Sequence, residues 1–80
     1  MQIIYVLRSK RDGNLYIGCT ADLEQRLKLH TSGQVQATKY RLPIELIYHE
    51  EYQDKYEAFR MERFYKTAPG KHILKNKIRG

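Results

Sequence analysis

The 80-residue sequence contains one cysteine, no tryptophan and only two prolines. A single cysteine cannot close an internal disulfide, and no Cys-x-x-Cys or His-x-x-x-His spacing points to a zinc site. No apolar run approaches the roughly 18 to 20 residues that a membrane-spanning helix needs, and the N-terminus lacks the pattern of a signal peptide. We therefore expect a soluble cytoplasmic protein without disulfides and without contact to a membrane.

A chain of this length is enough for one domain with a thin core, and we expect residues 1–80 to form that domain. Hydrophobic residues make up 41% of the chain, which is enough for a globular fold and too much for a disordered one. The aromatic residues are seven tyrosines and two phenylalanines. Because a tyrosine ring packs while its hydroxyl remains available, some of these residues are candidates for chemistry.

The positive charge is concentrated at the C-terminal end. The net charge is +6, yet residues 1–54 carry seven Lys or Arg against seven Asp or Glu. Residues 55–80 carry eight against two, so the whole excess lies in the last third. A basic surface of this kind is typical of a protein that binds a phosphate backbone. A merely solvated basic face is the plainer interpretation.

The first half of the chain predicts a hairpin followed by a helix. Met1–Leu7 and Leu15–Thr20 are rich in β-branched and aromatic residues, which favours strands. Asp12-Gly13 between them is a strong hairpin signal. Thr20 is a candidate N-cap for the helix, and Gly33 is a natural C-cap.

The second half predicts a strand and a helix with a basic end. Ile44–Tyr52 has the composition and partial alternation of a strand. Asp54 caps the next helix, and Pro69-Gly70 is predicted to stop it. Lys71–Arg79 is predicted to form either a short basic helix or a tail. The chain is thus predicted to be α+β, with a three-stranded antiparallel sheet flanked by helices in the order strand, strand, helix, strand, helix.

Four polar side chains stand on elements that otherwise look buried. Tyr5 and Tyr16 lie on the two strands of the hairpin, but only the register decides whether they share a face. Arg26 and His30 are four residues apart, so they meet on one stripe of the helix. Two phenols, a guanidinium and an imidazole suggest a site.

These motifs resemble the GIY-YIG endonuclease superfamily, in particular its small single-domain branch. Ile3-Ile4-Tyr5 stands at the first tripeptide, with Ile3 in place of the family's glycine, and Tyr16-Ile17-Gly18 is the second tripeptide intact. Arg26 and His30 match the family's first helix. Ala58–Glu62 resembles the helix that bears its metal-binding glutamate. Each motif alone is weak, but their order and spacing over nearly the whole chain are specific.

The resemblance implies a DNA endonuclease that uses one divalent ion, Mg²⁺ or Mn²⁺, held by Glu62. It implies that Tyr5 is the general base, that Tyr16 orients water or phosphate, and that Arg26 stabilises developing charge. His30 would polarise Tyr5 or the leaving group, and the sequence leaves open whether Tyr5 or His30 finally takes the proton. The family's motifs also include Gly18 and, in some members, a late asparagine near Asn76.

Each catalytic candidate has an ordinary structural alternative. Glu62 could form only a helix ion pair with Lys66, four residues on, and Arg26 could pair with Asp22. The two tyrosines could be core residues, and His30 a surface residue near a helix end.

The cationic residues of the second half would follow the nucleic-acid backbone, which gives affinity with low sequence specificity. The candidates are Lys39, Arg41, Arg60, Arg63, Lys66, Lys71 and Lys75. We expect single-stranded or structured DNA rather than plain duplex, in repair or recombination. The alternatives are a catalytically weak nucleic-acid-binding module and an interaction module that depends on a protein partner.

Overall fold

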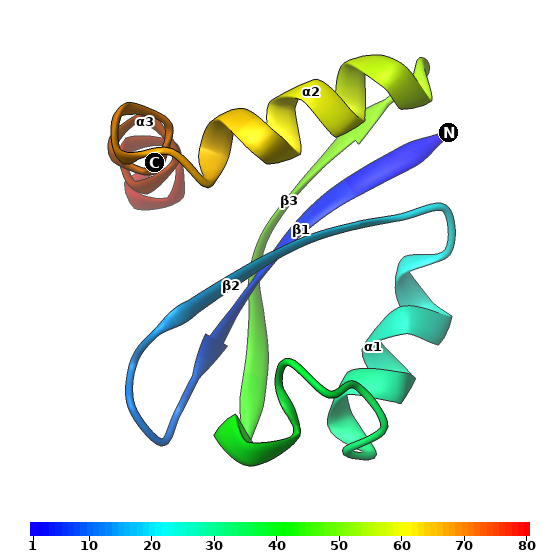
Figure 1. Cartoon of the computed structure of the whole chain (residues 1–80), viewed down its shortest axis with the longest axis vertical. Coiled ribbons are helices and arrows are strands. Elements are labelled where there is room, and N and C mark those ends of the chain that lie inside the picture. The colour runs from blue at the N-terminus through cyan, green and yellow to red at the C-terminus, as the bar shows by residue number, and fades with distance from the viewer.

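The computed structural model describes all 80 residues and contains one sheet and three α-helices. The predicted α+β class and three-stranded antiparallel sheet are confirmed (Figure 1). The elements in chain order are β1 (Gln2–Ser9), β2 (Leu15–Thr20), α1 (Leu23–Thr31), a 3-10 turn (Lys39–Arg41), β3 (Ile44–Tyr52), α2 (Lys55–Tyr65) and α3 (Ala68–Arg79).

The sheet has the order β2-β1-β3, so β1 is the central strand and β2 is an edge. Tyr5 lies opposite Gly18, and Leu7 lies opposite Tyr16. Because side chains alternate between the two faces of a sheet, this register places Tyr5 and Tyr16 on the same face. The question that the sequence left open is thereby answered.

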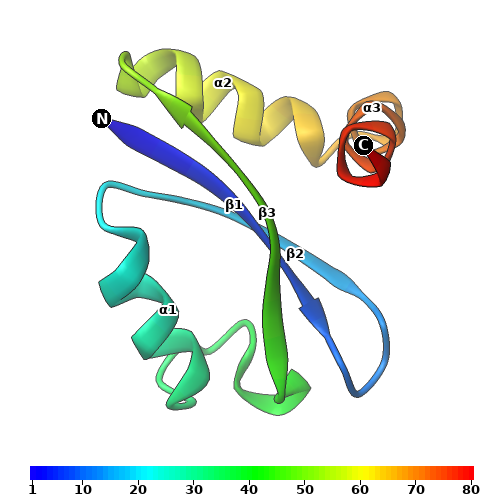
Figure 2. The ribbon, with the colours of Figure 1, turned by 180° about the vertical axis from the view of Figure 1, so that it is seen from behind.

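One face of the sheet packs against α2 and α3. Figures 1 and 2 show both helices on this side of the sheet, with α3 running crosswise to α2 at the C-terminal end of α2. The buried cluster between the sheet and these helices consists of Ile4, Val6, Ile17, Tyr65 and Leu74. Burial of these apolar side chains is the main contribution that holds the two helices on the sheet.

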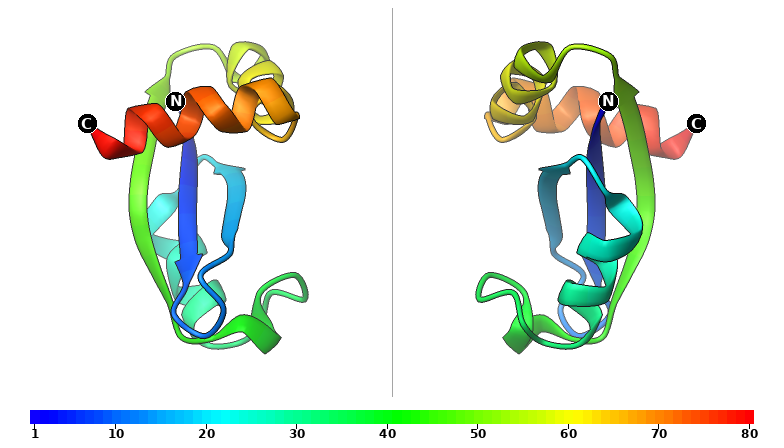
Figure 3. Two further views of the ribbon diagram at one scale, coloured as in Figure 1. Left: turned by 90° about the vertical axis from the view of Figure 1, so that its left-hand side faces the viewer. Right: turned by 90° about the vertical axis from the view of Figure 1, so that its right-hand side faces the viewer.

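The other face of the sheet is covered by α1 and the segment that follows it (Figure 3). Tyr5 and Leu7 are each 1% exposed on this side, while His30 of α1 and Thr38 of the following segment are 0% and 1% exposed. The core on this face is therefore partly polar. None of the helices has the length and apolar character required to cross a membrane.

The start of α1 differs from the prediction. Asp22, rather than Thr20, is the N-cap, and its carboxylate accepts a hydrogen bond from the Gln25 backbone N–H. The Thr20 hydroxyl instead accepts from the backbone N–H of Asp22. At the other end, Gly33 has φ +79, as a left-handed position after a helix favours glycine.

The prediction that Pro69-Gly70 stops a helix is wrong. The helix α2 ends at Tyr65, and both residues lie in the first turn of α3, whose N-cap is Thr67. Proline is tolerated there because the first N–H groups of a helix have no partner within the helix. Gly70 is required by packing, since a Cβ on it would lie 1.7 Å from the Phe64 carbonyl oxygen. The C-terminal segment is consequently a helix of 12 residues rather than a tail.

Candidate active site

The Tyr5 phenol lies between a guanidinium and an imidazole, both from α1. Its oxygen is 2.9 Å from His30 Nε2 and accepts a hydrogen bond from Arg26 Nε at 3.3 Å. The spacing of four residues on α1 aims both side chains at the same point of the sheet. Arg26 has no carboxylate within 4 Å, so the alternative of an Asp22 ion pair does not describe its position.

The far side of His30 is held by Thr38. His30 Nδ1 is 2.7 Å from Thr38 Oγ1, and both side chains are buried. Burial lowers the pKa of His30, and the positive charge of Arg26 lowers it further. The imidazole is therefore neutral at neutral pH, and one ring nitrogen keeps a lone pair.

Burial raises the pKa of Tyr5, whereas it lowers that of His30. The hydrogen bond from Arg26 lowers the pKa of Tyr5, but the effect of burial is larger and this pKa is raised overall. A neutral phenol has one proton to donate, and Arg26 has only donors to offer. His30 Nε2 is the acceptor within reach, and phenol is a more acidic hydroxyl than threonine. We therefore assign the proton of His30 to Nδ1, where it donates to Thr38, and the lone pair to Nε2, where it accepts from Tyr5.

Tyr16 and Gly18 complete the wall on the β2 side. The Tyr16 ring lies edge-on to the His30 ring, with 5.2 Å between centroids, and 6.4 Å from that of Tyr5. A Cβ on Gly18 would lie 2.4 Å from both Cζ and the hydroxyl oxygen of Tyr5. The phenol thus occupies the space that any side chain at position 18 would need.

Glu62 lies on α2, which packs on the opposite face of the sheet from Tyr5, and it forms no hydrogen bond with this cluster. Its negative charge contributes to the raised pKa of Tyr5, while its carboxylate accepts from Lys66 Nζ at 3.2 Å. The predicted ion-pair alternative is therefore present as a contact. No group of three or more His, Cys, Asp or Glu side chains is placed to hold a metal ion. A divalent ion held by Glu62 alone would complete its shell with water and substrate oxygens, as Mg²⁺ usually does.

The cations predicted to bind nucleic acid fall into two groups. Arg60 and Arg63 line a surface hollow of about 510 Å³ on α2, together with Glu62, and Lys66 pairs with that glutamate. Arg41, Lys71 and Lys75 line a second groove, of about 520 Å³, beside α3. This groove includes Ile17, whose side chain points to the opposite face of the sheet from Tyr16.

Two predicted residues belong to neither group. Lys39 lies in the 3-10 turn, with its ammonium group 4.9 Å from the centroid of the Tyr40 ring. Asn76 is exposed on α3, and its side chain forms no hydrogen bond with the rest of the protein. The structure thus gives Asn76 no contact with the Tyr5 cluster.

The family model of the GIY-YIG catalytic domain matches residues 1–77. The chain belongs to the GIY-YIG family. GIY-YIG domains are typically nucleases, and nucleic acid is the class of substrate that membership implies. The match spans all three strands and nearly all of α3, so it covers every element that surrounds Tyr5.

Similar GIY-YIG chains carry the name UPF0213 protein. One from Bacillus pumilus is 47% identical over 64 residues, which cover 79% of this chain and 64% of that protein. One from Staphylococcus saprophyticus is 40% identical over 73 residues, covering 90% and 88%. The solution NMR structure of a UPF0213 protein from Bacillus halodurans aligns with a TM-score of 0.59 at 34% identity, covering 95% of this chain and 84% of that one.

Sequence reasoning missed Thr38 and a second polar cluster. Thr38 follows His30 by eight residues in an irregular segment, where no periodic pattern marks it. The second cluster surrounds Glu50 of β3, which accepts hydrogen bonds from the hydroxyls of Tyr48, Tyr52 and Tyr65 and from Lys77 Nζ. A partly alternating strand that contains two tyrosines and three glutamates gives a weak signal for it.

Proposed function

We propose that this chain is a divalent-metal-dependent endonuclease that hydrolyses DNA phosphodiester bonds with low sequence specificity. The observation that carries the proposal is the buried Tyr5 phenol, hydrogen-bonded to Arg26 and paired with a neutral His30. In a plain core tyrosine, the hydroxyl would need only one partner. Here it has a fixed cation on one side and a proton acceptor on the other.

Tyr5 and His30 together can take a proton from an attacking water. The water gives its proton to the Tyr5 oxygen while the Tyr5 proton passes to His30 Nε2, over the 2.9 Å that separates the two atoms. The water O–H bond and the original Tyr5 O–H bond break, and a new O–H and an N–H bond form. His30 thus ends as imidazolium, and the Nδ1 hydrogen bond to Thr38 holds the ring in place throughout.

In this proposal, Arg26 stabilises negative charge. Its Nε donates to Tyr5, which leaves the terminal nitrogens of the guanidinium available to a phosphate oxygen. Glu62 would hold the divalent ion, which when bound supplies charge neutralisation at the phosphate or the leaving oxygen. Tyr16, half-buried at the edge strand, would orient water or phosphate by its hydroxyl.

The test is cleavage of supercoiled plasmid and of labelled single-stranded DNA with Mg²⁺, Mn²⁺ or EDTA. We expect metal-dependent cutting that Tyr5→Phe, Arg26→Ala and Glu62→Gln each reduce by at least 100-fold, because each loses one part of the machinery. Tyr40→Phe and Glu57→Gln are matched controls, since both side chains are exposed and lie outside the site. The two controls should cut like the parent protein.

Two results would contradict the proposal. If Glu62→Gln cuts at the parent rate, Glu62 is not the metal ligand. Absence of cutting on every substrate, with nucleic-acid binding intact and the fold unchanged by circular dichroism, would leave a binding module with the same fold.

A further inference from the structure

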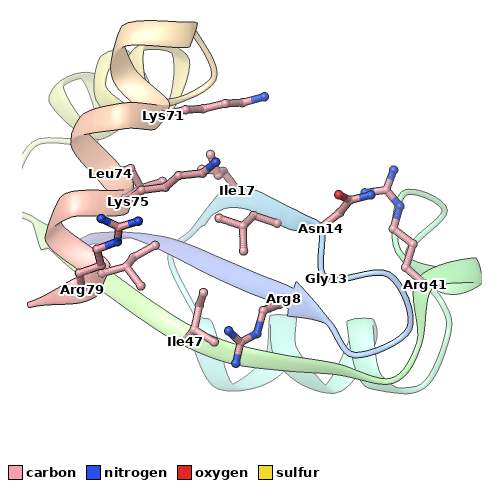
Figure 4. A pocket seen from close by; sticks show the side chains of 12 residues that line it. Arg8, Gly13, Asn14, Ile17, Arg41, Ile47, Lys71, Leu74, Lys75 and Arg79 are labelled. Carbon is pink, nitrogen blue, oxygen red and sulfur yellow. The ribbon is translucent and has the colours of Figure 1, made fainter.

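The groove beside α3 lies away from the Tyr5 cluster, on the other face of the sheet. It has a volume of about 520 Å³ and runs from α3 to the turn of the β1–β2 hairpin and the 3-10 turn. Figure 4 shows Lys71 and Lys75 extending from α3 on one side, and Asn14 and Arg41 on the other. The volume is in the range typical of pockets that bind small molecules or parts of larger ones.

The floor of this groove is aliphatic. Ile17 and Leu74 belong to the buried core, and three partly buried side chains that pack against that core complete the floor. Its members are Leu15, Ile17, Ile47, Leu74 and Ile78. An open groove with an apolar floor offers a surface for a flat apolar group.

The rim of the groove is entirely cationic or neutral. No Asp or Glu lines it, while five cations do: Arg8, Arg41, Lys71, Lys75 and Arg79. Arg8 is neutralised in part by Glu45, at 2.6 Å, but the other four have no carboxylate within 4 Å. Three of these four are spaced by four residues on α3, so they form one stripe along the helix.

We propose that this groove binds an unpaired segment of a nucleic-acid strand, with a base on the aliphatic floor and phosphates along the cationic rim. The occupant must combine a flat apolar group with closely spaced negative charges, which an unpaired nucleotide segment does. A base pair in duplex hides its faces by stacking, so duplex could use the rim and not the floor. The aliphatic floor has no hydrogen-bonding groups that read base edges, so the groove should accept any base.

The edge strand β2 connects the groove with the candidate active site. Tyr16 faces the site and Ile17 faces the groove, because consecutive residues of a strand point to opposite faces. A flexible strand can pass around this edge, whereas a straight duplex cannot. The inference rests on the proposed function only for the class of occupant, and the groove could bind a strand in a protein that does not cut.

Binding is measured by fluorescence anisotropy of a labelled 12-nucleotide mixed-sequence single strand and of a blunt duplex of the same sequence. EDTA in the buffer and the Tyr5→Phe background prevent cutting. The binding measurement is therefore valid whether or not the protein is a nuclease. The test variant is Lys75→Ala with Arg79→Ala. Its control is Lys28→Ala with Lys55→Ala, which removes the same charge outside the groove.

We expect the groove pair to weaken single-strand binding at least tenfold, and the control pair by less than threefold. The slope of log affinity against log salt should fall by about 1.4, which is about 0.7 for each lost phosphate contact. Ile78→Ser, which keeps the charge and makes the floor polar, should weaken the single strand at least threefold and leave the duplex unchanged. Thermal unfolding of each variant separates these losses from loss of the fold.

Three results would overturn the inference. Equal losses in the two pairs mean that net charge alone drives binding. An equal effect of Ile78→Ser on single strand and duplex, or no effect on either, means that no base contacts the floor. Binding to phosphatidylserine vesicles is measured with the same variants. If Lys75→Ala with Arg79→Ala abolishes vesicle binding but leaves single-strand binding intact, the rim serves lipid headgroups.

Discussion

Replacing Glu50 by glutamine tests the polar cluster that joins three elements of the fold. The Glu50 carboxylate accepts from Tyr52 and Tyr65 hydroxyls at 2.8 Å each and from Lys77 Nζ at 2.9 Å. It also accepts from the Tyr48 hydroxyl. The carboxylate thus links β3 to α2 through Tyr65 and to α3 through Lys77. The glutamine variant keeps the shape, loses the charge and places two N–H donors among groups that are themselves donors.

The magnitude follows from the pKa of the carboxyl group. Burial alone would raise it, but the hydrogen bonds from the surrounding hydroxyls and the Lys77 ammonium outweigh burial and lower the pKa from 4.5 to about 2. A difference of about 2.5 pKa units corresponds to about 3 kcal/mol of stability. The side chain is only 15% exposed, so little of this is screened by solvent. Since the folded-state pKa is the lower one, this stability is present above pH 4.5 and is lost as the pH falls toward 2.

Urea unfolding followed by circular dichroism measures the effect. We expect Glu50→Gln to lower the free energy of unfolding by about 3 kcal/mol at pH 7, and by less than half of that at pH 3. Glu57→Gln, on the exposed side of α2, is the control and should change the value by less than about 0.5 kcal/mol. The same deficit at pH 7 and at pH 3 would refute the reasoning, because the loss would then not come from the charge.

Three further perturbations concern the candidate site. Gly18→Ala should reduce cleavage at least tenfold and lower stability by about 1 to 3 kcal/mol, since its Cβ would overlap the Tyr5 phenol. Cleavage and thermal unfolding assays measure both effects. A variant that is stable and fully active would contradict this packing. Thr38→Val should lower the free energy of unfolding by about 1 to 3 kcal/mol and reduce cleavage, because His30 Nδ1 loses its buried partner. Thr38→Ser keeps the hydroxyl and should retain both stability and cleavage. Equal losses in the two variants would point to packing rather than to the hydroxyl. The lowered pKa of His30 means that the unfolded chain takes up a proton near pH 6.5 and the folded chain does not. Stability should therefore fall below pH 6.5, and urea titrations at pH 7.5 and 5.5 should show a smaller fall in His30→Gln than in the parent chain.

The sequence is most informative where local chemistry decides the structure. The bounds of Leu15–Thr20 and Ile44–Tyr52 and the cap at Asp54 follow from β propensity and from the capping preference of aspartate, and the structure confirms them. The spacing of Arg26 and His30 also predicts their common direction. In each case the signal lies within a few residues, and no long-range contact competes with it.

Contacts between neighbouring segments of the fold explain the wrong helix stop at Pro69-Gly70 and the missed Thr38. Proline and glycine in succession usually end a helix, but here Pro69 lies in a first turn and Gly70 is present because α3 crosses the Phe64 carbonyl closely. That crossing turns α3 away from α2, so the basic residues of the second half divide between two surfaces. Thr38 reaches His30 only because the segment after α1 folds back on the sheet, and no periodicity predicts such a contact.

The register of β2 connects the two proposed binding surfaces. In Tyr16-Ile17-Gly18, alternation sends the first and third residues to the candidate active site and the second to the core and the groove. Tyr16 supplies a hydroxyl, Gly18 leaves space for the Tyr5 phenol, and Ile17 provides both buried apolar area and part of the groove floor. A slip of one residue would aim Ile17 at His30 and bury a phenol in the aliphatic core. The tripeptide therefore contributes to both the candidate site and the core, and the hairpin turn at Asp12-Gly13 helps to fix the register on which both depend.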